Sequence, residues 1–359
     1  MTAAGVLPLL LRTAPRYFTA PATSLDIQSR IGRPDGSPAD ANPCVVVLTR
    51  AVDREMDELS LWLAAHGTAT VRIDTDRCSD TDVRWDPVTG ILDWDGDRLR
   101  PQVCWLRYFD PEAATISGHD DSVAHYAREQ WAAWASTMMG HDSARRINPR
   151  ARTGVPDRIT QLRAARAVGL RTPATVVTSR LMSALPAIPG TGDLLVKALG
   201  RHKIETEPGY LRGVFPQRVG RAAVAAETAV EPAPVMVQEY LPSDGEFRIY
   251  VVGGRLIAYR VTRPTPDALW TTPSAVAVEP CDVDPALAQA LRRLTTRFDL
   301  DIAAFDLLDT PEGPVFLEVN PECDWLWADH AAGTTATSAA VRELVLELLT
   351  TNDTEDHDD

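Results

Sequence analysis

Apolar and polar residues alternate along the first part of the chain in a pattern that predicts a parallel α/β unit. Residues 44–49 form a run rich in β-branched side chains, which is typical of a buried strand. Residues 54–66 place apolar side chains on one face of a helix, and Gly67 suits the C-terminal cap of that helix. Residues 69–73 then alternate as a strand does. A strand, a helix and a strand in this order favour parallel pairing.

The same unit is expected to continue with a hairpin and a long helix. Strands are predicted at 90–94, 98–100 and 102–109, and Asp95-Gly96 is typical of a hairpin turn. Residues 121–139 carry apolar side chains at helical spacing, beginning with Val123, which favours core packing for the tryptophans of this helix over ligand binding. The polar and basic stretch 140–156 is predicted to link this unit to a second one.

The second unit is predicted to begin with a helix that Pro156 opens and Gly169 closes. The stretch 200–220 has no clear period and is expected to be irregular, and an amphipathic helix is expected over 287–298. Gly253-Gly254 suits a tight turn, because such a turn needs positive φ angles. The expected strands lie at 172–178, 193–199, 235–241, 247–252 and 256–261.

A hairpin near the C-terminus combines apolar strands with a few acids. Glu318 and Asn320 project to the same face because they are two residues apart. A turn centred on Glu312 places Asp306 directly opposite Glu318. Opposed carboxylates are unfavourable unless a cation lies between them, and two carboxylates with an amide oxygen suit Mg²⁺. A wet sheet face that carries acids without a metal is the alternative.

Four motifs between residues 197 and 321 resemble motifs of the ATP-grasp ligases and occur in the same order. Lys197 resembles the strand lysine that holds ATP phosphates, and residues 237–241 resemble the hinge strand whose backbone pairs with adenine. Glu246 resembles the acid that takes the ribose hydroxyls, and residues 305–306 with 316–321 resemble the metal signature. The resemblance implies a metal site of Asp306, Glu318 and Asn320, and an ATP site of Arg158, Lys197, Gln238, Glu239, Tyr240, Leu241 and Glu246.

Further motifs are similar to those of the graspetide maturases, which crosslink ribosomal peptides of the microviridin type through esters or amides. They are residues 103–107, 147–149, 161–162, 169–178 and 318–327. Three departures stand out. Arg158 replaces the usual first phosphate lysine, residues 269–271 replace an acidic-Trp-basic triplet, and residues 322–324 replace a glycine and a glutamine.

The resemblance implies an α/β (α+β) protein with the ATP-grasp fold and an N-terminal preceding α/β domain. Its expected parts are a flexible extension at 1–42, the preceding domain at 43–145, a central domain at 146–234, a C-terminal domain with the Mg-binding hairpin at 235–351, and an acidic tail at 352–359.

The resemblance also implies a two-step reaction that uses ATP and Mg²⁺. A carboxylate attacks the γ-phosphate to give an acyl phosphate, and a hydroxyl or an amine then displaces phosphate. By the parity of their hairpin, Arg248 and Arg260 are predicted to face one site and to bind the acyl phosphate or the substrate carboxylate. Surface arginines that balance nearby acids are the alternative.

Other functions stay open at this point. A stand-alone ligase would join a small amino acid to a carboxylate, and a phosphotransferase would stop after moving the γ-phosphate to an alcohol. A nucleotide-binding partner protein would lack turnover altogether, which the arginine at position 158 would fit. The expected substrate is a precursor peptide or a small carboxylate.

The composition of the chain limits which binding partners and which cellular compartment are expected. A net charge of −14 disfavours nucleic-acid binding, which needs a basic surface. No apolar stretch approaches the ~20 residues needed to span a bilayer. The five cysteines are scattered and form no metal-binding pair, as in a cytoplasmic protein. The sequence leaves the oligomeric state open, a homo-oligomer included.

Overall fold

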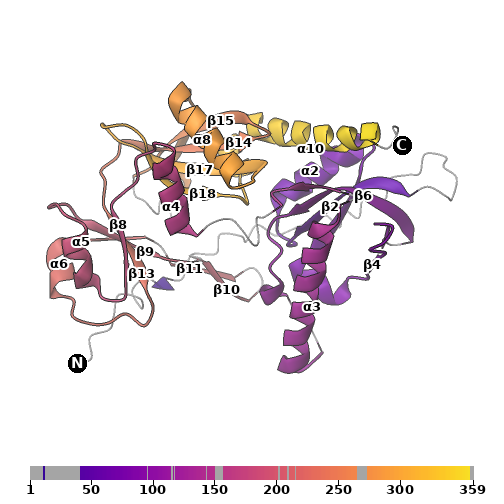
Figure 1. Ribbon diagram of the computed structural model, residues 1–359, viewed down its shortest axis with the longest axis horizontal. Helices are drawn as coiled ribbons and strands as arrows, with labels where there is room; N and C mark the ends of the chain where they lie inside the picture. The colour runs from indigo at the N-terminus through magenta and orange to yellow at the C-terminus, as the bar shows by residue number, and fades with distance from the viewer. Residues whose placement is uncertain are drawn as a thin grey trace.

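The computed structural model describes most of the chain after residue 40. The described residues are 11–12, 41–94, 96–114, 116, 118–142, 144–149, 157–200, 203–207, 210–214, 216–264 and 273–355. Their strands form sheets of three, four, five and six strands. The six-stranded sheet lies at one end of the molecule and the four-stranded sheet at the other (Figure 1).

The preceding domain is built on the six-stranded sheet, in which β2 pairs in parallel with both β3 and β6. One face of this sheet packs against α2 and α10, and the other against α3. The strands are β2 (Asn42–Thr49), β3 (Ala69–Asp74), β4 (Arg84–Trp85), β5 (Leu92–Trp94), β6 (Asp97–Leu106) and β7 (Arg145–Ile147). The helices are α2 (Arg54–Ala65) and α3 (Asp121–Gly140), with 3-10 turns at Thr75–Asp80 and Pro111–Ala113.

Three predictions for this domain are wrong in detail. β6 is one strand where two were expected, because a bulge at Gln102 accommodates Pro101 opposite Cys44. Part of the predicted linker is a strand, since β7 pairs with β6. Val123 of α3 is 45% exposed, because the buried face runs through Ala124 and Met138 instead.

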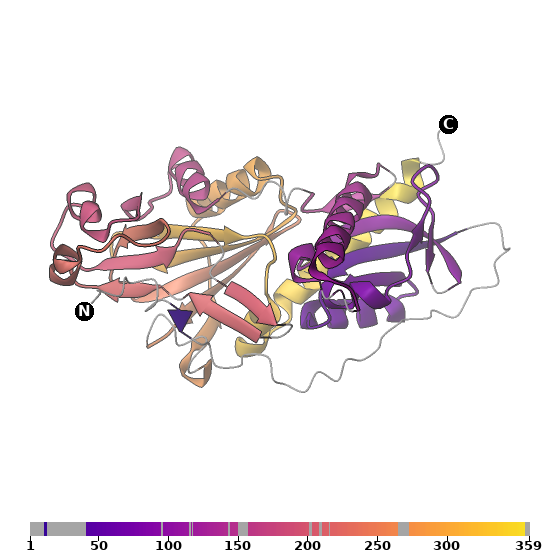
Figure 2. The same cartoon turned by 90° about the horizontal axis from the view of Figure 1, so that it is seen from below.

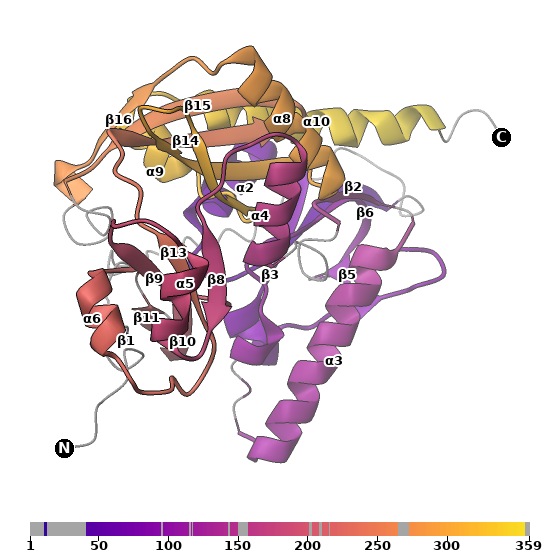
Figure 3. The same ribbon diagram turned by 60° about the vertical axis from the view of Figure 1, so that its left-hand side comes forward.

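The central domain is a four-stranded antiparallel sheet in the order β12-β9-β13-β8, with α5 and α6 beside it (Figure 3). A separate hairpin, β10–β11, takes β1 on its outer edge. The strands are β1 (Leu11–Arg12), β8 (Thr175–Thr178), β9 (Leu194–Ala198), β10 (Lys203–Glu207), β11 (Tyr210–Val214), β12 (Gln217–Val219) and β13 (Val235–Glu239). The helices are α5 (Ala184–Ala187) and α6 (Arg221–Ala226), with a 3-10 turn at Leu181–Ser183.

The expectation of an irregular stretch at 200–220 is therefore wrong. Three short strands lie there, and charged residues at alternating positions of β10 hide the apolar pattern of a strand. Most of the expected extension 1–42 lies outside the described residues, while Leu11 and Arg12 pair with β11.

The C-terminal domain is a five-stranded antiparallel sheet in the order β16-β15-β14-β17-β18. Helices α4 and α8 cover one face, and Figure 2 shows both on the side opposite the β10–β11 hairpin. The strands are β14 (Gly245–Val252), β15 (Arg255–Thr262), β16 (Ala277–Pro280), β17 (Ile302–Asp309) and β18 (Val315–Asn320). The helices are α4 (Arg158–Ala167), α8 (Pro285–Arg297), α9 (Leu326–Ala331) and α10 (Ala336–Glu355), with a 3-10 turn at Pro273–Ala275.

Helix α4 begins two residues after the predicted start, at Arg158. Asp157 caps it, because the Asp157 carboxylate accepts a hydrogen bond from the backbone N–H of Thr160 at 3.0 Å. Pro156, which was expected to open the helix, lies outside the described residues. At the other end Gly169 has a φ of 90°, as predicted for a glycine that closes a helix.

The preceding and C-terminal domains share one apolar core. Trp105 of β6 stacks on Trp325 with the ring centroids 6.1 Å apart, and α10 extends from the C-terminal sheet across the preceding domain (Figure 1). No helix among the described residues is long and apolar enough to cross a membrane.

Asn148 fastens the two domains at the end of β7. Its side chain accepts hydrogen bonds from the backbone N–H groups of Asp301 and Ile302 at 2.8 and 3.0 Å. It also donates to the carbonyls of Ile302 and Pro321 at 2.8 and 3.0 Å. Asn148 is buried and has a φ of 52°, a left-handed conformation that asparagine adopts more readily than most residues.

We expect Asn148→Ala to lower the free energy of unfolding by about 3 kcal/mol, because it leaves buried backbone groups without partners. Asn148→Gly, which accepts the left-handed φ freely, should recover only a small part of that loss. Urea denaturation measures both, with exposed Asn42→Ala as the control. A loss for Asn148→Ala no larger than that of the control would contradict this interpretation.

Candidate active site

Three strands of the C-terminal sheet place charged side chains in a row on one face. Arg248 of β14 pairs with Asp306 of β17, and Asp306 pairs with Glu318 of β18. The predicted opposition of Asp306 and Glu318 is confirmed, and a bulge at Leu317 follows it. Asn320 lies on the same face and donates its side-chain N–H to Asp306 at 2.8 Å.

Arg248 and Asp306 form a partly buried ion pair in this row, with side chains 10% and 25% exposed. Arg248 Nη1 donates to both carboxylate oxygens of Asp306, at 2.9 and 3.0 Å. Burial raises the pKa of Asp306, and the positive charge of Arg248 opposes that rise. Burial alone would lower the pKa of Arg248, but Asp306 raises it on balance, so the arginine stays protonated.

The central domain and α4 bring two more cations to the same place. Arg158, the first residue of α4, donates from Nε to Glu318 at 3.0 Å and from Nη1 to the carbonyls of Ala198 and Gly200 at 2.9 and 2.6 Å. Lys197 precedes Ala198 on β9. Burial lowers the pKa of Lys197, and the negative charge of Glu318 opposes this lowering. The carboxylate row therefore faces two cations across the gap between two sheets.

Helix α4 also fixes the strand that carries the acids. The side chain of Gln161 accepts a hydrogen bond from the backbone N–H of Val319 at 3.0 Å and donates to the carbonyl of the same residue at 3.3 Å. Val319 stands between Glu318 and Asn320, so a buried amide holds the backbone between two predicted metal ligands.

The predicted adenine-binding segment lies at the end of β13. The backbone N–H groups of Glu239 and Tyr240 donate to Ala174 and Asp193, both at 3.0 Å. The Gln238 side chain is buried and donates to Thr175 at 3.0 Å, on the sheet face that also carries Lys197. Among the described residues, the N–H of Leu241 has no hydrogen-bond partner.

Glu246, the predicted ribose ligand, forms an ion pair with Arg263 just after β15. Burial raises the pKa of Glu246, and Arg263 opposes the rise. Arg263 was not predicted from the sequence to belong to this site. The hairpin register contains the signal, since Glu246 pairs with Val261 and Arg263 lies two residues further along the same face.

The prediction that Arg260 faces the same site as Arg248 is wrong. The turn has two residues, Gly253 and Gly254, with φ of 54° and 80°, and such a turn pairs residues whose numbers have an odd sum. Arg260 consequently pairs with Phe247, on the opposite face of the sheet from Arg248. There it forms an ion pair with Asp309 at 2.9 Å, and its side chain is 41% exposed.

The donor set at the row suits a hard cation. In the part of the chain that the structure describes, no group of three His, Cys, Asp or Glu side chains is placed to hold a metal ion. Two carboxylates and one amide oxygen nevertheless match Mg²⁺, which takes few protein ligands and completes its shell with phosphate and water. The substituted triplet at 269–271 lies outside the described residues.

We expect Arg248→Met to destabilise the fold by about 2 kcal/mol, because it removes the cationic partner of the partly buried Asp306 carboxylate. The matched change Arg260→Met breaks a half-exposed pair and should cost less than about 1 kcal/mol. Denaturant midpoints at pH 7 compare the two variants. Equal losses would mean that Asp306 does not depend on Arg248.

Known proteins resemble this chain in structure rather than in sequence. No protein-family description matches the sequence, and no curated protein matches it. The macrocyclase MdnC of Microcystis aeruginosa, solved with the precursor peptide MdnA, is 22% identical, with a TM-score of 0.68 over 84% of this chain and 99% of that one. A RiPP-associated ATP-grasp ligase of Chryseobacterium gregarium, in complex with ADP and a leader and core peptide, is 18% identical, with a TM-score of 0.68 over 85% and 97%.

The ATP-grasp ligase PsnB, complexed with a minimal precursor, Mg and ADP, is 18% identical, with a TM-score of 0.65 over 85% of this chain and 98% of that one. The matched part of this chain has more residues than the range 146–351. The match therefore includes residues of the preceding domain. The chain therefore has the ATP-grasp ligase fold with an N-terminal preceding α/β domain, as the resemblance of its motifs implied.

Proposed function

We propose that the protein is an ATP- and Mg²⁺-dependent carboxylate ligase that crosslinks side chains of a ribosomal precursor peptide through esters or amides. The observation that carries this proposal is the convergence of Asp306, Glu318 and Asn320 with Arg158 and Lys197 between two sheets. The three structurally similar ligases, each solved with its peptide, support a peptide as the substrate.

ATP would lie between β9, β13 and the carboxylate row. The N–H of Leu241 would donate to the adenine, and Glu246 would accept from the ribose hydroxyls. Lys197 and Arg158 would neutralise phosphate oxygens, a role in which the guanidinium of Arg158 offers several donors. Arg158 already lies at the boundary of this space, bound to Glu318 on one side and to two carbonyls after Lys197 on the other.

Asp306, Glu318 and Asn320 would hold Mg²⁺, which supplies positive charge to the phosphate oxygens when bound. The substrate carboxylate attacks the γ-phosphorus, the bond to the β-phosphate oxygen breaks, and ADP leaves. A hydroxyl or amine then attacks the carbonyl carbon of the acyl phosphate, and phosphate leaves with its bonding electron pair and takes up the proton that the nucleophile loses. Arg248 lies beside Asp306 in the row, where its charge would stabilise the acyl phosphate. Most of the catalysis would be positioning and charge neutralisation.

We expect Glu318→Gln to fold normally and to lose ATP turnover by roughly a hundredfold or more, because it removes negative charge from the metal site with little change of shape. Glu312→Gln is the matched control, since Glu312 stands in the turn of the same hairpin with its side chain 72% exposed. ADP release in Mg²⁺ measures both variants. Near-normal turnover by Glu318→Gln would remove the metal site from the mechanism.

The products test the type of reaction. A precursor peptide incubated with the protein and MgATP should lose the mass of one water for each ADP formed, and mild alkali should open ester crosslinks while amides survive. A peptide that gains phosphate would identify a phosphotransferase instead. ATP-dependent condensation of small amino acids without any peptide product would identify a stand-alone ligase.

A further inference from the structure

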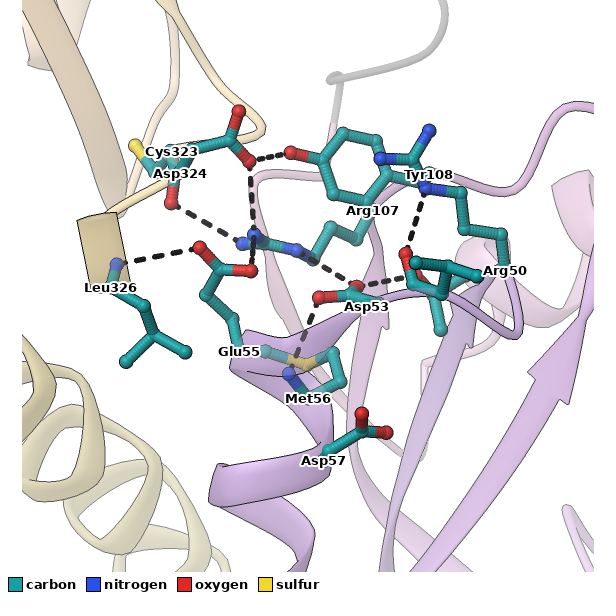
Figure 4. A network of polar contacts seen from close by, with 12 residues as sticks. Arg50, Asp53, Glu55, Met56, Asp57, Arg107, Tyr108, Cys323, Asp324 and Leu326 are labelled. Carbon is teal, nitrogen blue, oxygen red and sulfur yellow. Dashed lines mark hydrogen bonds and ion pairs between the residues drawn. The ribbon is translucent and has the colours of Figure 1, made fainter. Parts of the chain in front are cut away.

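A buried arginine of the preceding domain lies beneath the loop that follows β18 (Figure 4). Arg107 comes directly after β6, and its side chain has no exposed surface. Its Nε donates to Asp53 at 3.0 Å, and Asp53 also accepts from the Thr49 hydroxyl at 2.5 Å. These contacts anchor the guanidinium within its own domain.

The other two nitrogens of Arg107 reach residues of the C-terminal domain. Nη1 donates to the carbonyl of Cys323 at 3.5 Å, and Nη2 lies 3.6 Å from the Asp324 carboxylate. The guanidinium carbon lies 4.7 Å from the centre of the Trp325 ring, within cation–π range. Arg107 therefore contacts three successive residues of the loop.

Glu55 reinforces this contact from the first turn of α2. Its carboxylate lies 3.5 Å from Arg107 and accepts from the backbone N–H groups of Trp325 and Leu326 at 3.2 and 3.4 Å. Burial raises the pKa of Glu55 to about 7, and the charge of Arg107 opposes the rise while Asp324 and Asp53 add to it. Arg107 thus helps this acid to remain ionised near neutral pH.

The loop needs such support because its backbone is strained. Cys323 has a φ of 49°, a left-handed conformation that costs a non-glycine residue roughly 1 kcal/mol or more. Surrounding contacts must fix a residue held in this way. Arg107 binds the carbonyl of Cys323 itself, and Glu55 binds the backbone two residues further on, at Trp325.

The opposite side of the loop meets the candidate active site. The carbonyl of Asp324 accepts hydrogen bonds from the Tyr250 hydroxyl at 2.6 Å, from Arg248 Nη2 at 3.3 Å and from Trp327 Nε1 at 3.1 Å. Arg248 is the residue that binds Asp306. One backbone carbonyl thus joins the loop that Arg107 holds to the arginine of the carboxylate row.

We propose that Arg107 is a positioning residue for ligation: it holds the loop at Cys323 and Asp324 so that the Asp324 carbonyl orients Arg248 beside the substrate acyl group. This inference rests on the proposed function. A buried arginine among three acids is a poor way merely to join two domains, because desolvation consumes much of the attraction. The neighbouring apolar core of Trp105, Trp325 and α10 already joins them.

The test compares Arg107→Lys with Arg72→Lys in the full-length protein. Lysine at position 107 keeps the charge beside Asp53 but has one nitrogen, so it cannot also hold the loop. Arg72 is the control, a partly buried arginine of the same domain that pairs with Asp57 and Asp74. We expect Arg107→Lys to lower turnover roughly 10- to 100-fold, with nucleotide affinity unchanged within about twofold, because misplacement alone has effects of this size. Amide hydrogen exchange over residues 321–327 should become faster in this variant only.

A double-mutant cycle with Tyr250→Phe, which removes one hydrogen bond to the Asp324 carbonyl and one from Arg248, tests whether Arg107 acts through this contact. If Arg107 acts through that carbonyl, the double variant should lose less turnover than the product of the two single-variant losses. Multiplicative losses, unchanged exchange over 321–327, or an equal effect of Arg72→Lys would each overturn the inference. If the wild type proves to have no ligase turnover, the proposed function fails, and the exchange comparison decides whether Arg107 holds the loop.

Discussion

The structure depends on a balance of charge between neighbouring strands. Asp306 and Glu318 stand opposite each other in an apolar hairpin, where two unpaired carboxylates would repel. Each is held by an arginine from a different element, Arg248 from within the sheet and Arg158 from the start of α4. The interaction that makes the hairpin tolerable thus also fixes where α4, β9 and the C-terminal sheet lie relative to one another.

Buried amides set the fine position of the same strands. Gln161 bonds to both backbone groups of Val319, and Asn148 bonds to the start of β17 and to Pro321 just after β18. An amide side chain can donate and accept hydrogen bonds at the same time. Each of these residues therefore binds backbone N–H and C=O groups without adding charge. Arginines therefore bind the carboxylates of Asp306 and Glu318, while neutral amide side chains bind the backbone of the strands that carry them.

Local periodicity was enough to predict much of this arrangement. The helices, most strands and the pairing of Asp306 with Glu318 follow from patterns a few residues long. The ATP-grasp fold followed from the resemblance of motifs rather than from periodicity. The roles of the individual site residues stay predictions.

The wrong or missing predictions have two causes. In some places a single residue changes the strand register, and in others the interacting residues are distant in sequence. Arg260 was misplaced because a two-residue turn shifts parity by one, and Pro101 was taken as a break although a bulge absorbs it. Arg107 could not be connected to Asp324 from sequence, because nothing local to either residue refers to the other. Long-range ion pairs of this kind become visible only when the domains are assembled.

The path of α10 has a consequence for how the protein is made. This helix, near the C-terminal end of the chain, packs in the same apolar core as Val45, Val47 and Trp105 of the preceding domain. During synthesis these residues leave the ribosome long before α10 exists, so the part of their sheet face that α2 does not cover stays exposed until α10 has been made. The preceding domain therefore completes its core only after the C-terminal sheet and α10 have been made.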